Sequence, residues 1–278
     1  MKKLLITGGN GVIGHYFSSL FNPDSYVAPS KHDMPVDDAR RVLQYVYNIQ
    51  PSAIVHMAAI TDVDFCESHP HEAHRVNVLG TEHIVSACKH LRVPLVYISS
   101  AAVFDGEKPH YVEHDVPGPV NVYGETKYKS EQIIQQSGID FMIVRIGWLI
   151  GGGKKEKKFV SYIFEKLKNG TDVQAVSDIH GSVIYAPDVI AFIRDALAKH
   201  LTGIYHVGYT GTPSRYDIAL ELKRLLKSTS QVFPVPAQLF TKTFHAARPK
   251  HEVLVSTKLP FTVHWKERLR DYVMSELI

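Results

Sequence analysis

Two side chains capable of acid–base chemistry, Tyr123 and Lys127, stand four residues apart in the stretch 120–127. On a helix this spacing puts both side chains on one face. An ammonium group beside a phenol favours the phenolate, so we expect Lys127 to lower the tyrosine pKa from about 10. A phenol tuned in this way can exchange a proton with a carbonyl or alcohol oxygen. A surface tyrosine and a solvated lysine are the competing interpretation of so short a motif.

A glycine-rich turn near the N-terminus predicts a dinucleotide site. Residues 3–7 are an apolar run typical of a buried strand, and residues 12–21 are predicted to form the following helix. The glycines between them would permit a tight turn, close approach of a diphosphate, and packing of the helix on the strand. The residues expected at the cofactor here are Gly8, Asn10, Gly11, Val12, Ile13 and Gly14. A purely structural glycine turn is the alternative.

The end of a second predicted strand, at 26–29, bears on the choice of cofactor. In a dinucleotide fold this end faces the adenosine ribose, where an acid favours NAD and a basic residue favours NADP. Ser30 and Lys31 could hold a 2′-phosphate, so we expect NADP(H) rather than NAD(H). Asp33 keeps NAD(H) open, and a solvated loop charge is the alternative for Lys31.

Strands and helices alternate through the first half of the chain. Further strands are predicted at 53–56, 95–99 and 139–146, and further helices at 38–49, 71–90 and 123–137. This alternation predicts an α/β fold with a Rossmann-type, doubly wound parallel sheet.

Small or hydroxylic residues follow two of these strands. Ala58 and Ala59 come after the strand at 53–56 and could lie against a cofactor. Ser100 follows the strand at 95–99, at the carboxyl edge where such sheets bind ligands. We expect its hydroxyl to hydrogen-bond a substrate oxygen. A serine that only satisfies a loop amide is the alternative.

The second half of the chain has a different character. Residues 151–158 are rich in glycine and lysine, which predicts either a solvated loop or a lid over a diphosphate. Short strands (182–185, 204–207) and helices (187–200, 214–226, 264–277) follow, with a helix start also expected at 256–259. We expect residues 1–150 to form the dinucleotide-binding Rossmann core. Residues 151–278 would form a small C-terminal α/β lobe that binds substrate, with segments such as 182–207 returning to the core. Arg248 is a candidate clamp for an oxyanion or phosphate.

The composition argues against several other classes of protein. The chain has 278 residues, of which 45% are hydrophobic and 21% charged, an ordinary globular composition. A diffuse net charge of +3 argues against a nucleic-acid partner, and no apolar run is long enough to span a membrane. Two cysteines without CxxC spacing are consistent with a reducing, cytoplasmic location. The histidines form no metal-ligand set, so we expect no metal.

Taken in chain order, these motifs resemble the extended short-chain dehydrogenase/reductase superfamily, and within it the dTDP-4-dehydrorhamnose reductases. The matching segments span nearly the whole chain and comprise 7–14, 58–67, Asn77, Ser100, 121–127, 145–148, 185–189 and 247–249. The resemblance implies NAD(P)H-dependent reduction of the C4 ketone of a nucleotide-linked sugar. It implies that Tyr123 is the acid, that Lys127 holds the nicotinamide ribose, and that Ser100 binds the sugar oxygen. It also implies that Trp148 and Arg248 lie at the sugar-nucleotide pocket.

Several positions depart from the family pattern. After the fourth strand the family has an acidic and an aromatic residue, where this chain has Ala101 and Ala102. His56 replaces an asparagine of the family pattern, and Pro35 replaces an aspartate. An Asn-Ser pair of the family is replaced by His251-Glu252. These changes leave the identity of the sugar open. The nearest alternative is an NDP-sugar epimerase of the same superfamily, which returns the hydride to its product. A third is a non-catalytic NADP-binding regulatory subunit, as in methionine adenosyltransferase. A homodimer is also considered.

Overall fold

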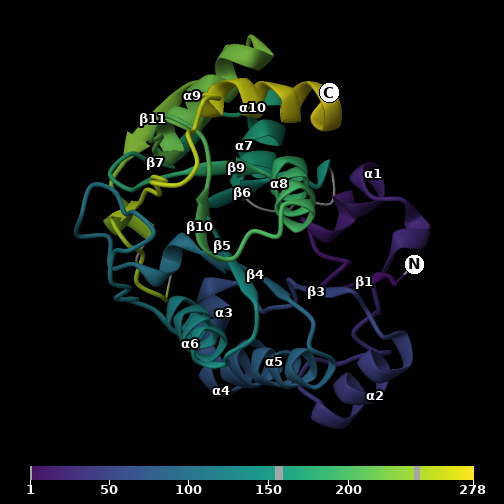
Figure 1. The fold of residues 1–278 in the computed structure, drawn as a ribbon. Helices are drawn as coiled ribbons and strands as arrows, with labels where there is room; N and C mark the ends of the chain where they lie inside the picture. Colours follow the sequence, from purple (N-terminus) through teal and green to yellow (C-terminus); the bar gives the residue numbers. More distant parts are fainter. Residues whose placement is uncertain (1, 154–158, 241–244) are drawn as a thin grey trace.

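A computed structural model describes residues 2–153, 159–240 and 245–278. Its centre is a six-stranded parallel sheet in the order β10-β5-β4-β3-β1-β2 (Figure 1). The strands are Leu4–Thr7 (β1), Tyr26–Val27 (β2), Ala53–His56 (β3), Leu95–Ser100 (β4), Phe141–Ile146 (β5) and Gly203–Val207 (β10). The chain runs outward from β1 to β2 on one side and from β3 to β10 on the other. The order therefore reverses between β1 and β3, where sheets of this kind bind ligands. The predicted doubly wound α/β fold is confirmed.

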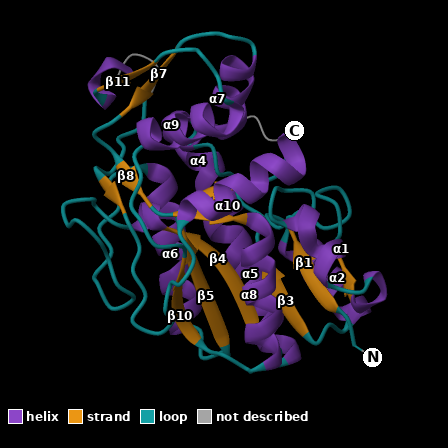
Figure 2. Cartoon of the chain, turned by 90° about the horizontal axis from the view of Figure 1, so that it is seen from above, coloured by secondary structure: helices purple, strands orange, loops and turns teal. Residues whose placement is uncertain are grey.

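Helices cover both faces of the sheet (Figures 1 and 2). Neighbouring residues of β1 show why both faces are apolar: Leu5 belongs to one hydrophobic core and Ile6 to the other. The helices of the Leu5 face are α2 (Ala39–Ile49), α5 (Gly80–Leu91) and α6 (Val122–Gln136), and those of the Ile6 face are α1 (Phe17–Leu20) and α8 (Ala186–Ala198).

The second half of the chain adds a smaller layer above the Ile6 face. Its elements are β6 (Trp148–Ile150), α7 (Phe159–Lys168), β7 (Val173–Val176), β8 (His180–Gly181), β9 (Val183–Tyr185), α9 (Arg215–Leu226), β11 (Val232–Val235), β12 (His251–Glu252) and α10 (Trp265–Tyr272). The strands pair in parallel as β7–β11, β8–β12 and β6–β9. The core around Ile6 continues into this layer as far as Phe164 and Val232. One hydrophobic core therefore joins the two halves.

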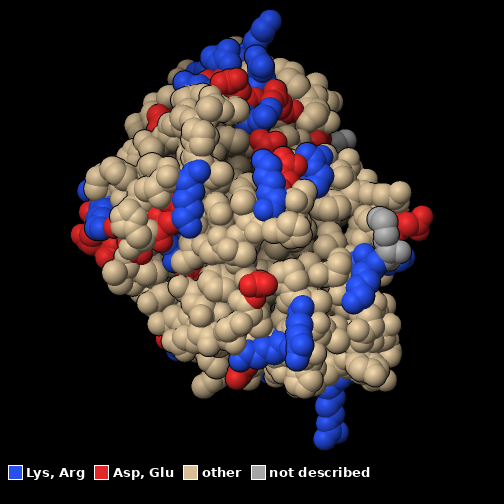
Figure 3. All heavy atoms as spheres, in the orientation of Figure 1, with Lys and Arg blue, Asp and Glu red and all other residues tan. Residues whose placement is uncertain are grey.

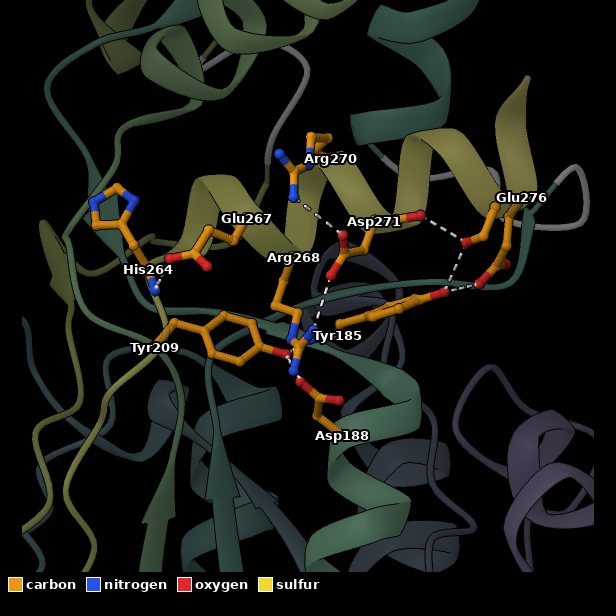
Figure 4. A network of polar contacts seen from close by, with 10 residues as sticks. Tyr185, Asp188, Tyr209, His264, Glu267, Arg268, Arg270, Asp271 and Glu276 are labelled. Carbon is orange, nitrogen blue, oxygen red and sulfur yellow. Dashed lines mark hydrogen bonds and ion pairs between the residues drawn. The ribbon is translucent and has the colours of Figure 1, made fainter.

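The C-terminal helix α10 is fixed by a polar network (Figure 4). His264 and Glu267 form a capping box at its start. Arg268 Nε donates to Asp188 Oδ2 at 2.8 Å, and the Tyr209 hydroxyl donates to the same oxygen at 2.6 Å. The Asp188 carboxylate thus ties α10 to the start of α8.

The last turn of the chain reaches back to Tyr16, just after the glycine-rich turn. The Tyr16 hydroxyl donates to Glu276 Oε2 at 2.6 Å, and Tyr185 also donates to the Glu276 carboxylate. The Gly152 amide donates to the Tyr16 hydroxyl oxygen. Glu276 therefore connects the segment after β1, the start of α8 and the segment after β6.

The predicted helix over 12–21 is wrong in extent. The structure has a 3-10 turn at Gly14–Tyr16 followed by the short α1. The Gly11 amide donates to the Gly8 carbonyl in a tight turn, so the chain at 11–13 is still turning where the helix was expected.

The predicted helix start at 256–259 is also wrong. The Thr257 amide and hydroxyl each donate to Glu113 Oε2 at 2.9 Å, and the Ser256 hydroxyl donates to Oε1. These side chains anchor a loop on Glu113, and Pro260 follows at once, where a helix could not continue normally.

Surface charge is dispersed on the face that Figure 3 shows. Lys and Arg side chains there stand among acidic and uncharged ones and form no continuous basic surface. Among the helices that the structure describes, none has the length and hydropathy needed to traverse a bilayer.

Candidate functional site

A cavity of about 1440 Å³ opens at the carboxyl edge of the sheet, beside the reversal point between β1 and β3. This volume exceeds that of pockets for one drug-sized ligand, about 300–1,000 Å³, and leaves room for a dinucleotide and a second ligand. The predicted site residues that line it are Gly8, Asn10, Gly11, Val12, Ile13, Gly14, Lys31, Ala58, Ala59, Ser100, Tyr123, Lys127, Trp148 and Arg248. Both halves of the chain therefore contribute to one cavity.

The glycine-rich turn and the 57–59 segment form one wall in close contact. Gly8 has φ +72°, and a Cβ there would lie 2.7 Å from the Ala58 nitrogen. A side chain at this position is thus excluded by both conformation and space. Thr7 Oγ1 accepts hydrogen bonds from the Met57 and Ala58 amides, each at 3.1 Å. The small residues after β3 are held against the turn in this way.

His56, which departs from the family pattern, is a buried and neutral bridge. Its Nδ1 lies 2.6 Å from Thr7 Oγ1, an oxygen that already accepts from two amides, so we assign Thr7 as the donor. His56 then carries its proton on Nε2, which lies 3.2 Å from Thr81 Oγ1. Burial lowers the His56 pKa to about 3. The ring therefore links β1, β3 and α5 without adding charge to the site.

The start of α6 is fixed on two sides, and this places Tyr123 in the first turn of the helix. Asn121 caps the helix by accepting from the Gly124 amide at 2.8 Å, and its Nδ2 donates to the Ala247 carbonyl at 2.8 Å. A Cβ at Gly124 would lie 2.1 Å from the Ala102 carbonyl oxygen. The helix therefore approaches the segment after β4 closely, next to Ser100.

Ser100 satisfies a loop amide, as one of the two alternatives expected, and it also faces the cavity. Its Oγ accepts from the Ala102 amide at 3.2 Å, and the same side chain lines the cavity. A hydrogen bond between Ser100 and Tyr123 acts on the phenol pKa. The two hydroxyl groups therefore lie together at the cavity wall.

The expected lowering of the Tyr123 pKa is wrong for this structure. Burial raises the pKa of Tyr123 to about 12, the hydrogen bond with Ser100 opposes the rise, and the negative charge of Glu252 adds to it. The cost of ionising a phenol that is shielded from water exceeds the stabilisation that a nearby cation gives to the phenolate. The phenol stays protonated around neutral pH, which is the form that can donate a proton.

The small effect of Lys127 on the Tyr123 pKa is explained by the burial of Lys127 itself. The side chain is buried, and its Nζ lies 4.1 Å from the centre of the Tyr97 ring. Burial lowers the Lys127 pKa to about 7, although the Glu131 carboxylate one turn later opposes the change. Lys127 is therefore only partly charged near neutral pH.

A buried ion pair anchors the middle of α6 to the sheet. Arg145 on β5 donates to Glu131 through Nε at 2.9 Å and Nη2 at 2.6 Å. The side chains are only 2% and 0% exposed, and Ser99 donates to the same carboxylate. This two-pronged contact sets α6, and with it Tyr123 and Lys127, against β4 and β5.

On the opposite wall, Trp148 is held from three directions. Its Nε1 donates to Glu252 Oε2 at 2.6 Å, and the Arg215 guanidinium lies 4.5 Å from its ring centre. A Cβ at Gly181 would lie 2.5 Å from the indole, so glycine leaves the space that the ring needs. Arg215 and Glu252 both line the cavity, and neither was predicted as a site residue. The one sequence signal that could have pointed to Glu252 was its departure from the serine that the family pattern has at this position.

Arg248 lines the cavity from the segment before β12. Its Nη2 contacts Asp64 Oδ2 at 2.7 Å, and the Ala246 amide donates to the other oxygen of that carboxylate at 3.0 Å. Asp64 belongs to α3 (Val63–Ser68). The predicted clamp is thus positioned by an ion pair across the two halves of the chain.

Comparison with known proteins agrees with this arrangement. A protein-family model described as RmlD substrate binding domain matches residues 1–277. The chain belongs to the RmlD substrate binding domain family. Similar solved structures share the whole fold described above.

Two such structures match almost the entire chain. The dTDP-4-dehydrorhamnose reductase of Yersinia enterocolitica is 36% identical, with a TM-score of 0.92 and 100% coverage of both chains. That of Bacillus anthracis, crystallised with NADP, is 30% identical with a TM-score of 0.92, covering 98% of this chain and 99% of that one. A curated relative with another name is methionine adenosyltransferase 2 subunit beta of Pongo abelii, 30% identical over 99% of this chain and 89% of its own length.

One expectation for this RmlD-family chain is not met, and a second falls outside the described residues. Ser30 does not line the cavity, because its hydroxyl donates to Asp33 Oδ2 at 2.6 Å within a local turn. The lysines of the expected lid, at 154, 155, 157 and 158, lie outside the described residues. Across 2–153, 159–240 and 245–278, His, Cys, Asp and Glu side chains form no group of three that could hold a metal.

Proposed function

We propose that this RmlD-family protein reduces the C4 ketone of a nucleotide-linked sugar with NADPH, as a dTDP-4-dehydrorhamnose reductase does. The observation that carries the proposal is a protonated phenol, Tyr123, beside the Ser100 hydroxyl in a cavity large enough for both ligands. The reductases of known structure support the choice of reaction, and the NADP in one of them supports the choice of cofactor.

The proposed chemistry divides between cofactor and protein. The nicotinamide supplies the hydride. Ser100 and Tyr123 donate hydrogen bonds to the ketone oxygen, which favours the charge that develops there. Tyr123 then transfers its phenolic proton to that oxygen. Lys127, buried one helical turn from Tyr123, would hold the nicotinamide ribose.

We also propose a division of labour along the chain. Residues 1–150 would bind the dinucleotide, since they contain the glycine-rich turn, Ala58 and Ala59. Residues 151–278 would supply most of the sugar-nucleotide contacts, including those of Arg215 and Arg248, which line the same cavity. Both guanidinium groups suit a diphosphate.

NADPH is preferred over NADH in this proposal because of the segment after β2. Lys31 lines the cavity, whereas the Asp33 carboxylate accepts from the Ser30 hydroxyl and amide. Hydrogen bonding to Ser30 lowers the Asp33 pKa, which keeps that carboxylate ionised but engaged with its own turn. A basic side chain thus faces the cavity where a ribose phosphate would lie, and Asp33 does not line it. Asp37 also lines the cavity, but its carboxylate is paired with Arg75 at 3.1 Å.

Replacement of Lys31 by alanine should weaken NADPH binding roughly tenfold, the scale of one hydrogen bond to a charged group, and leave NADH nearly unaffected. Titration of each cofactor by fluorescence would measure both dissociation constants. Lys2→Ala, an exposed lysine outside the cavity, is the control. Equal weakening of the two cofactors would contradict a 2′-phosphate contact.

The direct test of the function is absorbance at the reduced-nicotinamide band. The protein would be mixed with NADPH and dTDP-4-keto-6-deoxy sugar made enzymatically. Net loss of NADPH is expected, and it would exclude both an epimerase that recycles its hydride and a silent regulatory subunit. Isomerised sugar without NADPH loss would indicate the epimerase. NADPH binding without any sugar conversion would indicate the regulatory subunit.

A further inference from the structure

Glu252 holds a carboxylate at a fixed place in the cavity wall. It ends β12, which pairs with β8 through Glu252 and Gly181. Its carbonyl oxygen accepts from the Ser182 amide at 3.1 Å. The backbone that carries the side chain is therefore set by strand pairing, and the side chain lines the cavity.

The two carboxylate oxygens have different surroundings. Oε2 accepts from Trp148 Nε1 at 2.6 Å. Within the described part of the chain, Oε1 has no hydrogen-bond partner. This oxygen is not completely enclosed by protein, so a ligand can reach it. One oxygen is thus committed to the protein and the other is available to a molecule in the cavity.

The carboxylate also lies within electrostatic reach of the proposed proton donor. Its charge contributes to the raised pKa of Tyr123. Burial raises the pKa of Glu252 itself, and the hydrogen bond from Trp148 and the charges of Arg215 and Arg248 oppose that rise.

Geometry brings the same groups together. Asn121, two residues before Tyr123, donates to the Ala247 carbonyl. Ser100 pairs with Ile146, two residues before the Trp148 that holds Glu252. A ligand whose ketone lies at Tyr123 therefore presents the adjoining part of its ring to Glu252. An apolar group there would leave the free oxygen buried without a partner, which is unfavourable by a large margin.

We infer that Glu252 is a specificity-determining residue whose free oxygen accepts a hydrogen bond from a donor on the sugar ring carbon next to the ketone. This inference rests on the proposed sugar-nucleotide site. The donor is a hydroxyl or an ammonium group, because both offer the proton that a carboxylate oxygen needs. A sugar that is deoxygenated at this carbon is a poor ligand.

The replacement Glu252→Gln separates this role from a structural one. The amide has the shape of the carboxylate, and its single oxygen is needed to accept from Trp148. Its NH₂ group would then face the cavity, so the free position changes from acceptor to donor. Packing around Trp148 is preserved. An ammonium is no longer bound there, because it cannot accept from the NH₂ group, and a hydroxyl exchanges a charge-assisted hydrogen bond for a weaker neutral one.

The experiment measures binding by calorimetry to protein loaded with NADP⁺, so that no reduction takes place. The ligands are the dTDP-linked 4-keto-6-deoxy sugar with a 3-hydroxyl, its 3-deoxy counterpart and its 3-amino counterpart. We expect the unmodified protein to bind the 3-hydroxyl or the 3-amino sugar at least roughly tenfold more tightly than the 3-deoxy sugar. The larger of the two preferences identifies the donor as hydroxyl or ammonium. In Glu252→Gln the preference for the 3-amino sugar should fall close to unity and the preference for the 3-hydroxyl sugar should fall to that of a neutral hydrogen bond, with binding of the 3-deoxy sugar retained.

Glu125→Gln is the matched control, since this carboxylate is exposed, pairs with Lys129 at 2.6 Å and lies outside the cavity. It should keep the full preference. The inference is overturned if Glu252→Gln keeps that preference, if Glu125→Gln loses it equally, or if the unmodified protein binds all three sugars alike. NADPH turnover is assayed separately. Preferential binding without turnover would refute the reductase but support the role of Glu252.

Discussion

Tyr123→Phe should reduce kcat by roughly 10²–10⁴-fold, the usual contribution of a positioned general acid, with NADPH affinity nearly unchanged. The substitution removes only the phenolic oxygen, so the ring keeps its place in the first turn of α6. Because burial holds the Tyr123 pKa near 12, the unmodified phenol donates its proton throughout the neutral range. Steady-state oxidation of NADPH and equilibrium binding of NADPH are the two measurements.

Tyr128→Phe is the control for this prediction. Tyr128 lies on the same helix but packs against the Phe104 and Leu254 cluster and does not line the cavity. It should retain normal turnover. Equal activity in Tyr123→Phe and the unmodified protein would remove Tyr123 from the acid role, and an equal loss in both variants would point to the helix instead of the phenol.

The second large effect is expected on stability, from Arg145→Met. The change leaves the Glu131 carboxylate, with a side chain 0% exposed, without its two-pronged partner. Breaking a buried pair by removing one member typically costs about 3–5 kcal/mol. Urea unfolding followed by circular dichroism would report the free energy of unfolding. A loss below about 1 kcal/mol, as for an exposed pair, would contradict the structural role.

The double replacement Arg145→Met with Glu131→Leu tests the physical reason. Removing both members leaves neither charge of the pair without its partner, so the double variant should be more stable than Arg145→Met alone. If the double variant loses as much free energy of unfolding as Arg145→Met and Glu131→Leu lose when added together, the two side chains do not act as a pair. Activity measured on folded protein would then show whether α6 still places Tyr123 correctly.

Much of the first half of the chain could be predicted because its signals are local. The apolar runs of β1, β3, β4 and β5 are bounded by turns, and Gly8 requires a conformation that few other residues adopt. The Tyr123–Lys127 spacing needs only a helix, and the Asn121 cap provides its start. For the same reason the fold class followed from the alternation of elements.

The errors arise where distant or competing contacts decide. Ser30 carries the right group for a phosphate, but its neighbour Asp33 binds that hydroxyl in a local turn. Lys127 has the right spacing to lower the Tyr123 pKa, but burial dominates both groups. Glu252 meets Trp148 from 104 positions further along the chain, through the pairing of β12 with β8. No local pattern reports such a contact.

The Tyr16–Glu276 hydrogen bond spans 260 positions of the chain. During synthesis the glycine-rich turn emerges early, but this partner is added only near the end of the sequence. Domains begin to fold from the N-terminal side while translation continues, and contacts of such high sequence separation form late. The link from the segment after β1 to the C-terminal segment therefore forms only after residue 276 has been added. A chain that stops before residue 276 would leave the Tyr16 and Tyr185 hydroxyl groups without the carboxylate that they share.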